Sequence, residues 1–279
     1  MKNKWWAKLY LYAFFVFMYI PIVVLIVFSF NESKSNSVFT GFSLDWYRKL
    51  IHNEAILTAL MNTIIIAVVS SVLATILGTS AAIGIRNLRR SAKAVVMNVT
   101  YIPVINPEII TGVSLMLLFS YFVDHFHFSF GFFSLILAHI SFNVAYVIYS
   151  VMPKLRQMNP NLVEAAQDLG CSERQAFFKV VIPEIMPGIF SGFLMALTYS
   201  IDDFVVSYFT AGTQMETLPI TIYSMTRRKV SPEINALSTI IFVTIALILI
   251  LKNVLENRKL RRERQELITQ RKLLAEARA

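Results

Sequence analysis

Long apolar runs without a charged side chain constrain this sequence more than any other feature. Leu9–Phe30 contains 22 residues, Ala55–Ile85 contains 31 and Phe128–Pro153 contains 26. A helix needs about 20 apolar residues to cross a bilayer core of about 30 Å. The chain of 279 residues is 56% hydrophobic and 15% charged, which excludes an ordinary water-soluble enzyme and a disordered chain. The sequence therefore predicts an integral membrane protein.

Six apolar segments are long enough to span, so the predicted fold class is all-α with six transmembrane helices. We expect the first segment to be retained, because it is too long for a signal-peptide core and no cleavage site follows it. The predicted transmembrane domain covers residues 1–256, and a basic tail covers 257–279. The spans are expected at about 9–30, 58–85, 94–123, 128–152, 186–209 and 235–255.

The basic residues predict the orientation of the chain. Most of the 26 lysines and arginines lie at the amino terminus, in the second and fourth connections and in the tail. Cytoplasmic connections carry this excess, so both termini are predicted to be cytoplasmic, with the cluster 227–229 as an exception. The net charge of +9 then points to a lipid bilayer rather than to nucleic acid, and the tail is expected to lie on the anionic inner leaflet.

The fourth connection, 154–184, carries the end signals of two short helices. We expect a helix that begins at an N-cap and N1 proline and stops before a C′ glycine, then a second helix opened by a capping box and ended by prolines. The residues alone leave open whether this hairpin docks onto a soluble partner or lies on the lipid surface. The signals are Asn159, Pro160, Gly170, Ser172, Gln175, Pro183 and Pro187.

The stretch EAAQDLGCSERQAFFKVVIPEIMPG (164–188) resembles the EAA motif of ABC importer permeases, although Cys171 replaces a usual small residue. The resemblance implies the type I importer permease fold. It also implies that the hairpin is the coupling element that sits in a cleft of an ATP-binding subunit. The matching residues are Glu164, Ala165, Ala166, Gly170, Ile182 and Pro183.

Three further stretches, 19–31, 200–212 and 218–240, resemble permeases for spermidine and putrescine within that family. This implies uptake of polyamines across the bacterial inner membrane. The expected partners are a second permease subunit, a homodimeric ATP-binding subunit and an extracytoplasmic polyamine-binding protein. No G-x-x-x-x-G-K-[ST] motif is present, so ATP and Mg²⁺ are expected on the partner ATPase, with no cofactor and no enzyme activity on this chain.

Three carboxylates, Glu108, Asp202 and Asp203, lie within apolar spans at similar predicted depths. Acids inside a membrane are candidates for a substrate path, and an interrupted helix such as that around Pro103 and Pro107 often marks one. Two alternatives stay open. Glu108 is also placed to interact with a helix dipole after Asn106-Pro107, and the two aspartates could be a helix-end pair.

Three tyrosines flank these acids and are candidates for cation–π contacts with a polyamine: Tyr101, Tyr199 and Tyr208. Tyrosines near a membrane interface are also ordinary belt residues. His139, a lone histidine in the fourth span, is expected to make an interhelical hydrogen bond rather than to bind a ligand. Alternatives to the polyamine importer are an ABC permease for another small solute and an ion-coupled secondary transporter.

Overall fold

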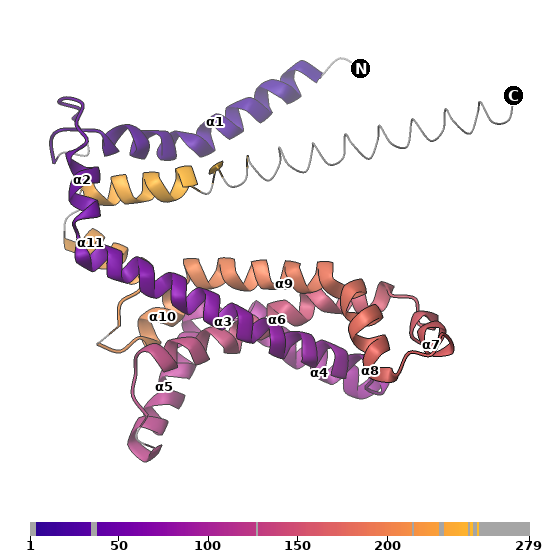
Figure 1. Cartoon of the computed structure of the whole chain (residues 1–279). Coiled ribbons are helices and arrows are strands. Elements are labelled where there is room, and N and C mark those ends of the chain that lie inside the picture. Colours follow the sequence, from indigo (N-terminus) through magenta and orange to yellow (C-terminus); the bar gives the residue numbers. More distant parts are fainter. Residues whose placement is uncertain are drawn as a thin grey trace, which may run out of the picture. The chain divides into compact units, whose positions relative to one another are not determined.

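The computed structural model describes residues 4–34, 38–126, 128–213, 215–228, 232–244, 246–247 and 250, and helices dominate this part of the chain (Figure 1). The helices are α1 Lys4–Ser29, α2 Asp45–Ile51, α3 Glu54–Arg86, α4 Arg90–Ile105, α5 Glu108–Phe126, α6 Phe132–Gln157, α7 Asn161–Asp168, α8 Glu173–Ala176, a π-helical turn Phe177–Val181, α9 Ile182–Asp202, α10 Val205–Thr210 and α11 Leu218–Arg228. The predicted all-α fold class is confirmed.

Five helical segments in the described part of the chain are long and apolar enough to cross a membrane. They are Lys8–Ser29, Glu54–Arg86, Glu108–Phe126, Phe132–Gln157 and Glu173–Asp202. The predicted sixth span, 235–255, is helical over its described stretch up to residue 244. Its end, and the whole predicted tail 257–279, lie outside the described residues, so the sixth span stays a prediction.

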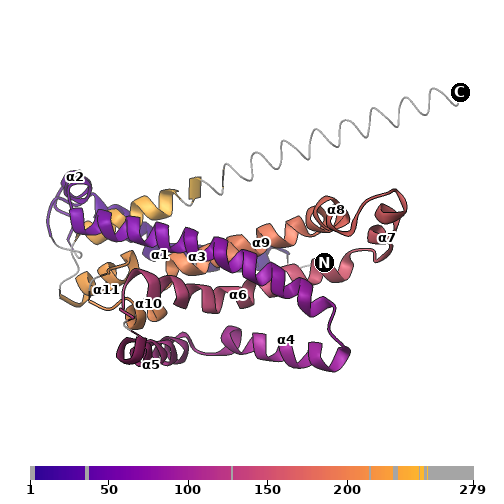
Figure 2. The same ribbon diagram turned by 60° about the horizontal axis from the view of Figure 1, so that its bottom comes forward.

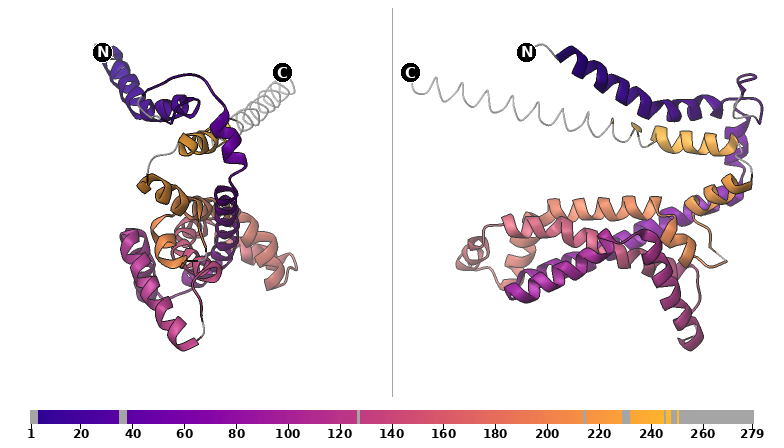
Figure 3. Two further views of the ribbon diagram at one scale, coloured as in Figure 1. Left: turned by 90° about the vertical axis from the view of Figure 1, so that its left-hand side faces the viewer. Right: turned by 180° about the vertical axis from the view of Figure 1, so that it is seen from behind.

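The helices belong to two compact units, one formed by Glu54–Ser224 and the other by the described parts of Met1–Asn53 and Met225–Ala279. In the second unit, two polar contacts connect the carboxyl end of α1 and the loop after it with α2 (Figure 3). The indole Nε1–H of buried Trp46 donates to the backbone oxygen of Asn31 at 2.6 Å. The hydroxyls of Ser29 and Tyr47 lie 2.6 Å apart.

The core of the larger unit lies where α3, α6 and α9 pack together. Its buried side chains are Ala82, Ile85, Val147, Ile148, Val151, Met152, Leu155, Ile185 and Ala196. Small residues allow this close approach, because a Cβ added at Gly78 would lie 2.7 Å from the Cβ of Val147. The small residue at Gly78 therefore lets α3 and α6 pack closely.

The predicted third span is interrupted, and the chain turns sharply between α4 and α5 (Figures 1 and 2). Pro103 lies inside α4, whereas the break is at Asn106 and Pro107. Asn106 has an extended backbone, with ψ at 136°. A residue before proline is pushed out of the helical region, so Pro107 is the cause of the interruption.

Pro183 and Pro187 do not end the second hairpin helix, contrary to expectation. α8 continues through the π-helical turn into α9, and both prolines lie within α9. A proline cannot donate to the carbonyl four residues earlier, and its ring crowds that carbonyl. The wider π turn directly before Pro183 accommodates this, with the N–H of Ile182 bonded to Phe177. One continuous helical segment therefore joins the hairpin to Asp202.

Candidate functional site: an acidic pocket

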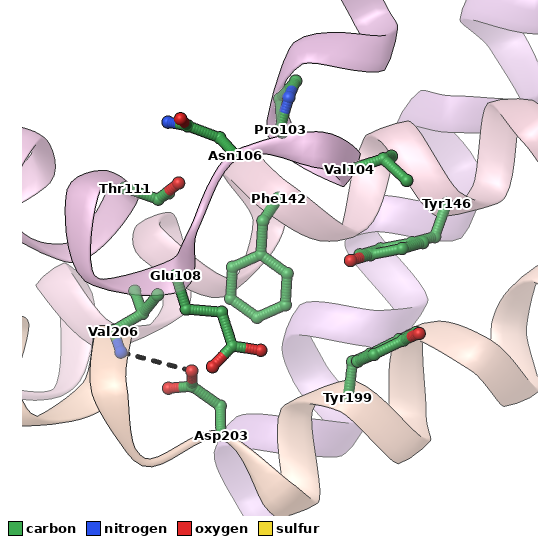
Figure 4. A pocket seen from close by; sticks show the side chains of 10 residues that line it. All are labelled: Pro103, Val104, Asn106, Glu108, Thr111, Phe142, Tyr146, Tyr199, Asp203 and Val206. Carbon is green, nitrogen blue, oxygen red and sulfur yellow. Dashed lines mark hydrogen bonds between the residues drawn. The ribbon is translucent and has the colours of Figure 1, made fainter.

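A pocket opens inside the larger unit, beside the break between α4 and α5 (Figure 4). It offers about 100 Å³ to water-sized molecules. Side chains from α4, α5, α6 and α9 and the residues around α10 surround it. The lining residues are Pro103, Val104, Asn106, Glu108, Thr111, Phe142, Tyr146, Tyr199, Asp203 and Val206.

The helix break places Glu108 at this pocket. Because α4 ends at Ile105 and α5 starts at Glu108, the carboxylate belongs to the first turn of a new helix. This is the position that the helix-dipole alternative requires, and the same side chain lines the pocket in Figure 4. Glu108 is exposed, and no hydrogen bond to it is found among the described residues, so both oxygens of its carboxylate can accept from a ligand.

A second break, between α9 and α10, places Asp203. Its Oδ1 accepts the N–H of Val206 at 3.2 Å, and its Oδ2 accepts the N–H and the hydroxyl of Ser207, each at 2.7 Å. The Asp203 side chain is 5% exposed. The helix-end alternative therefore describes its bonding, yet the same carboxylate also lines the pocket. Asp202, the last residue of α9, is exposed and lies outside the pocket.

Aromatic side chains form one wall of the pocket. The rings of Tyr146 and Tyr199 are stacked, with centroids 4.3 Å apart and planes 14° apart, and Phe142 lies beside them (Figure 4). Of the three tyrosines singled out in the sequence, Tyr199 lines the pocket. The ring of Tyr101 instead packs against that of Tyr149, with centroids 5.3 Å apart, and the ring of Tyr208 packs against that of Phe204, with centroids 5.5 Å apart.

Sequence reasoning missed Phe142 and Tyr146, although a signal for them exists. They follow His139 at intervals that place all three on one side of α6. His139 itself makes the expected interhelical hydrogen bond, from α6 to Ser207 on α10, at 3.0 Å. The side of α6 that carries the histidine is therefore the side that meets the pocket.

The hairpin lies at the other end of α9 from α10 (Figure 1). Asn159 accepts the N–H of Asn161, and Ser172 and Gln175 form the predicted capping box. After α7, Gly170 has a φ of +87°. The N–H of Gly170 bonds to Gln167 and that of Cys171 to Ala166, which is the Schellman pattern of a C′ glycine.

The residues of the EAA-like motif fall on both arms of this hairpin. On α7, Glu164 and Ala165 are exposed and Ala166 is buried. Ile182 is half-buried and Pro183 exposed at the start of α9. The exposed residues leave a surface of this hairpin free in the structure, and whether a partner covers it stays a prediction.

The chain belongs to the family of binding-protein-dependent transport system inner membrane components, whose profile matches residues 74–261. It is therefore a transport permease subunit of an ABC transporter and a multi-pass protein of the bacterial inner membrane.

Curated relatives narrow the class. The chain is 36% identical over 229 residues to the spermidine/putrescine permease PotC of Haemophilus influenzae, covering 82% of this chain and 87% of the relative. It is 35% identical to PotC of Escherichia coli K12, covering 76% of this chain and 79% of the relative. It is 36% identical to the putrescine permease PotI of the same strain, covering 78% and 79%.

A solved structure shows the same fold at low identity. The crystal structure of a bacterial ABC transporter that imports the acidic polysaccharide alginate matches with a TM-score of 0.66 and 17% identity. The match covers 90% of this chain and 94% of that one. This likeness concerns the fold, since one fold hosts many substrates.

Proposed function

We propose that this chain is a permease subunit of an ATP-driven importer that carries polyamines such as spermidine and putrescine into the cytoplasm. The single observation that carries the proposal is the charge of the pocket. Glu108 and Asp203 line it together, and none of its ten lining residues is basic. Two carboxylates without a basic neighbour in the lining favour cations and oppose anions. The names of the curated relatives support the same substrate class.

The aromatic wall suits the rest of such a substrate. A polyamine alternates ammonium groups with methylene segments, so it needs separated acids and apolar or aromatic surfaces. The stacked pair Tyr146 and Tyr199 offers ring surface to the methylenes and cation–π contacts to an ammonium. Asp202, Tyr101 and Tyr208 lie outside this pocket, and we propose that they face the part of the path completed by a second, PotB-like permease subunit.

The energy is proposed to come from a homodimeric ATP-binding subunit, which holds ATP and Mg²⁺ and docks onto the hairpin 154–184. The continuity of α9 supports this route, because the helix begins beside the hairpin and ends at Asp202. Its 21 residues give a length of about 32 Å at 1.5 Å per residue. A push on the hairpin would therefore reach the pocket along one rigid helix. An extracytoplasmic polyamine-binding protein is proposed to deliver the substrate.

The test is uptake of radiolabelled spermidine and putrescine by the assembled transporter in proteoliposomes. Glu108→Gln and Asp203→Asn should each raise the substrate concentration for half-maximal uptake by about tenfold, because each removes one charge that pairs with an ammonium. Asp124→Asn, an exposed acid near the far end of α5, is the matched control and should behave as wild type.

Three results would contradict the proposal in whole or in part. Wild-type kinetics for both pocket variants would remove the pocket from the path. Uptake that proceeds without ATP and without the ATP-binding subunit would favour an ion-coupled carrier instead. Faster uptake of another small cation than of either polyamine would keep the importer and change its substrate.

A further inference from the structure

We propose that His139 is a positioning residue that orients the Asp203 carboxylate through the hydroxyl of Ser207; this inference rests on the proposed function. The three side chains lie on α6, α10 and the break before α10. His139 Nε2 lies 3.0 Å from Ser207 Oγ, which lies 2.7 Å from Asp203 Oδ2. Nε2 and Oδ2 are themselves 3.6 Å apart, which is too long for a direct hydrogen bond. The side chains of His139 and Asp203 are 1% and 5% exposed, and Ser207 is completely buried. Bulk water therefore cannot replace these contacts.

The direction of the two hydrogen bonds follows from counting protons. An ionised carboxylate only accepts, so the single hydroxyl hydrogen of Ser207 points to Asp203. Ser207 Oγ must then accept from the imidazole, and Nε2 carries a hydrogen. In the neutral ring Nδ1 is left as an acceptor, and it is a buried atom without a partner in the described part of the chain. The result is a series of two hydrogen bonds in which His139 donates to Ser207 and Ser207 donates to Asp203.

These hydrogen bonds leave one oxygen of the Asp203 carboxylate able to accept from a substrate. Asp203 Oδ2 is occupied by the N–H and the hydroxyl of Ser207. Oδ1 accepts only the N–H of Val206 among the described residues, so it retains a lone pair. Asp203 and Val206 both line the pocket (Figure 4). The arrangement thus fixes Oδ2 in the protein and presents Oδ1 to an ammonium group.

The role of His139 is to decide where the serine hydroxyl points. A serine within a helix often donates to the carbonyl oxygen four residues earlier, which here is that of Asp203 itself. A donor at Nε2 occupies a lone pair of Ser207 Oγ and favours the rotamer that faces the carboxylate. Without that donor the hydroxyl is free to turn to the backbone, and the carboxylate loses its second anchor on Oδ2.

Two substitutions at His139 separate positioning from packing. His139→Leu removes the donor, whereas His139→Gln keeps an N–H donor on a side chain of similar reach. For the assembled transporter in proteoliposomes, His139→Leu should raise the spermidine concentration for half-maximal uptake by about tenfold. This is the effect expected when a hydrogen bond that supports a charged carboxylate is lost. His139→Gln should stay within about twofold of wild type, since the donor is preserved.

Asp203→Asn distinguishes failure of this inference from failure of the proposed function. If His139 acts through Asp203, the double variant His139→Leu/Asp203→Asn should be no worse than Asp203→Asn alone. Normal uptake by Asp203→Asn would overturn this inference, whereas the proposed role of the pocket would be overturned only if Glu108→Gln also showed normal uptake. Impaired uptake by Asp203→Asn together with additive effects in the double variant would overturn the positioning role alone.

Equal impairment by the leucine and glutamine variants would also overturn positioning, because it would assign His139 to packing. If His139→Leu fails to assemble, Ser207→Ala provides the same measurement. It removes the hydroxyl that links His139 to Asp203 and keeps the backbone N–H of residue 207 that donates to Asp203 Oδ2. Ser207→Ala should likewise raise the half-maximal concentration several-fold, and wild-type uptake kinetics for this variant would contradict the inference.

Discussion

The hairpin 154–184 lies at the start of α9, and α10, which carries the pocket residue Val206, lies at the other end (Figure 1). The hairpin and the acidic pocket are each stabilised by a different kind of contact. In the hairpin, Ser172 and Gln175 bond each other across three positions, and Gly170 and Cys171 close the end of α7. Beside the pocket, Ser207, which bonds the lining residue Asp203, contacts His139 across 68 positions. The hairpin is therefore a local structure that a partner can push as a unit, whereas the pocket depends on how separate helices meet.

This contrast predicts that damage to either region can be separated from damage to the other. A variant of the hairpin should leave the pocket intact and lose the connection to ATP hydrolysis. A variant of the pocket should keep that connection and lose substrate.

Within the hairpin, the largest effect is expected at Gly170, where φ is +87° and a Cβ would meet nothing within 4 Å. Gly170→Val places a β-branched residue in the left-handed region, which costs roughly 1–2 kcal/mol of strain. Association with the ATP-binding subunit should weaken by about tenfold or more. Co-purification from membranes, with the amount of inserted permease as the reference, measures this.

Gly170→Asn is the matched control, because asparagine has a similar size and tolerates a positive φ better than other residues do. It should retain most of the association. Equal loss with valine and asparagine would show that contact with the partner, rather than the turn, is sensitive. Normal association with both would contradict the docking role of the hairpin.

The same contrast explains what could be predicted from the sequence. Both ends of α7 and the start of α8 follow from Asn159, Gly170 and the capping box around Ser172, because each signal acts over a few positions. The break in the third span was also predicted, since Pro107 acts on its direct neighbour. The continuation of the hairpin into α9 was not predicted. The helix can pass through Pro183 only because a π turn precedes it, and no local sequence pattern indicates that turn.

The pocket could be predicted only in part. Glu108 and Asp203 are conspicuous as acids in apolar sequence, and both line it. Tyr146 was missed, whereas Tyr101 and Tyr208 were selected and lie elsewhere. Membrane helices are apolar on nearly all sides, so their sequence does not fix the rotation of each helix about its own axis. Which tyrosine faces a cavity is decided by packing of α4, α6, α9 and α10 against one another.

A smaller effect is expected from Ser172→Ala, which removes the N-cap of α8. The hydroxyl of Ser172 accepts the N–H of Gln175 at 3.4 Å, and loss of such a cap costs about 1 kcal/mol. Faster hydrogen exchange confined to 172–176 should report it. Ser172→Thr, which keeps the hydroxyl, is the control and should exchange as wild type. Faster exchange at the pocket as well would show that the two regions are not independent.

The smallest structural effect is expected at Glu108, and it divides the two pocket acids. Asp203 accepts three hydrogen bonds, and bonds to a charged group contribute about 1.5–3 kcal/mol each. Asp203→Asn should therefore lower the thermal unfolding midpoint of the detergent-solubilised transporter. Glu108 accepts none from the described residues and has only the helix dipole to lose, so Glu108→Gln should shift the midpoint by less.

Both variants should impair uptake to a similar extent, because the substrate meets one charge from each. A larger loss of stability at Glu108 with intact uptake would assign that residue to the helix end and leave Asp203 as the only acid of the path on this pocket.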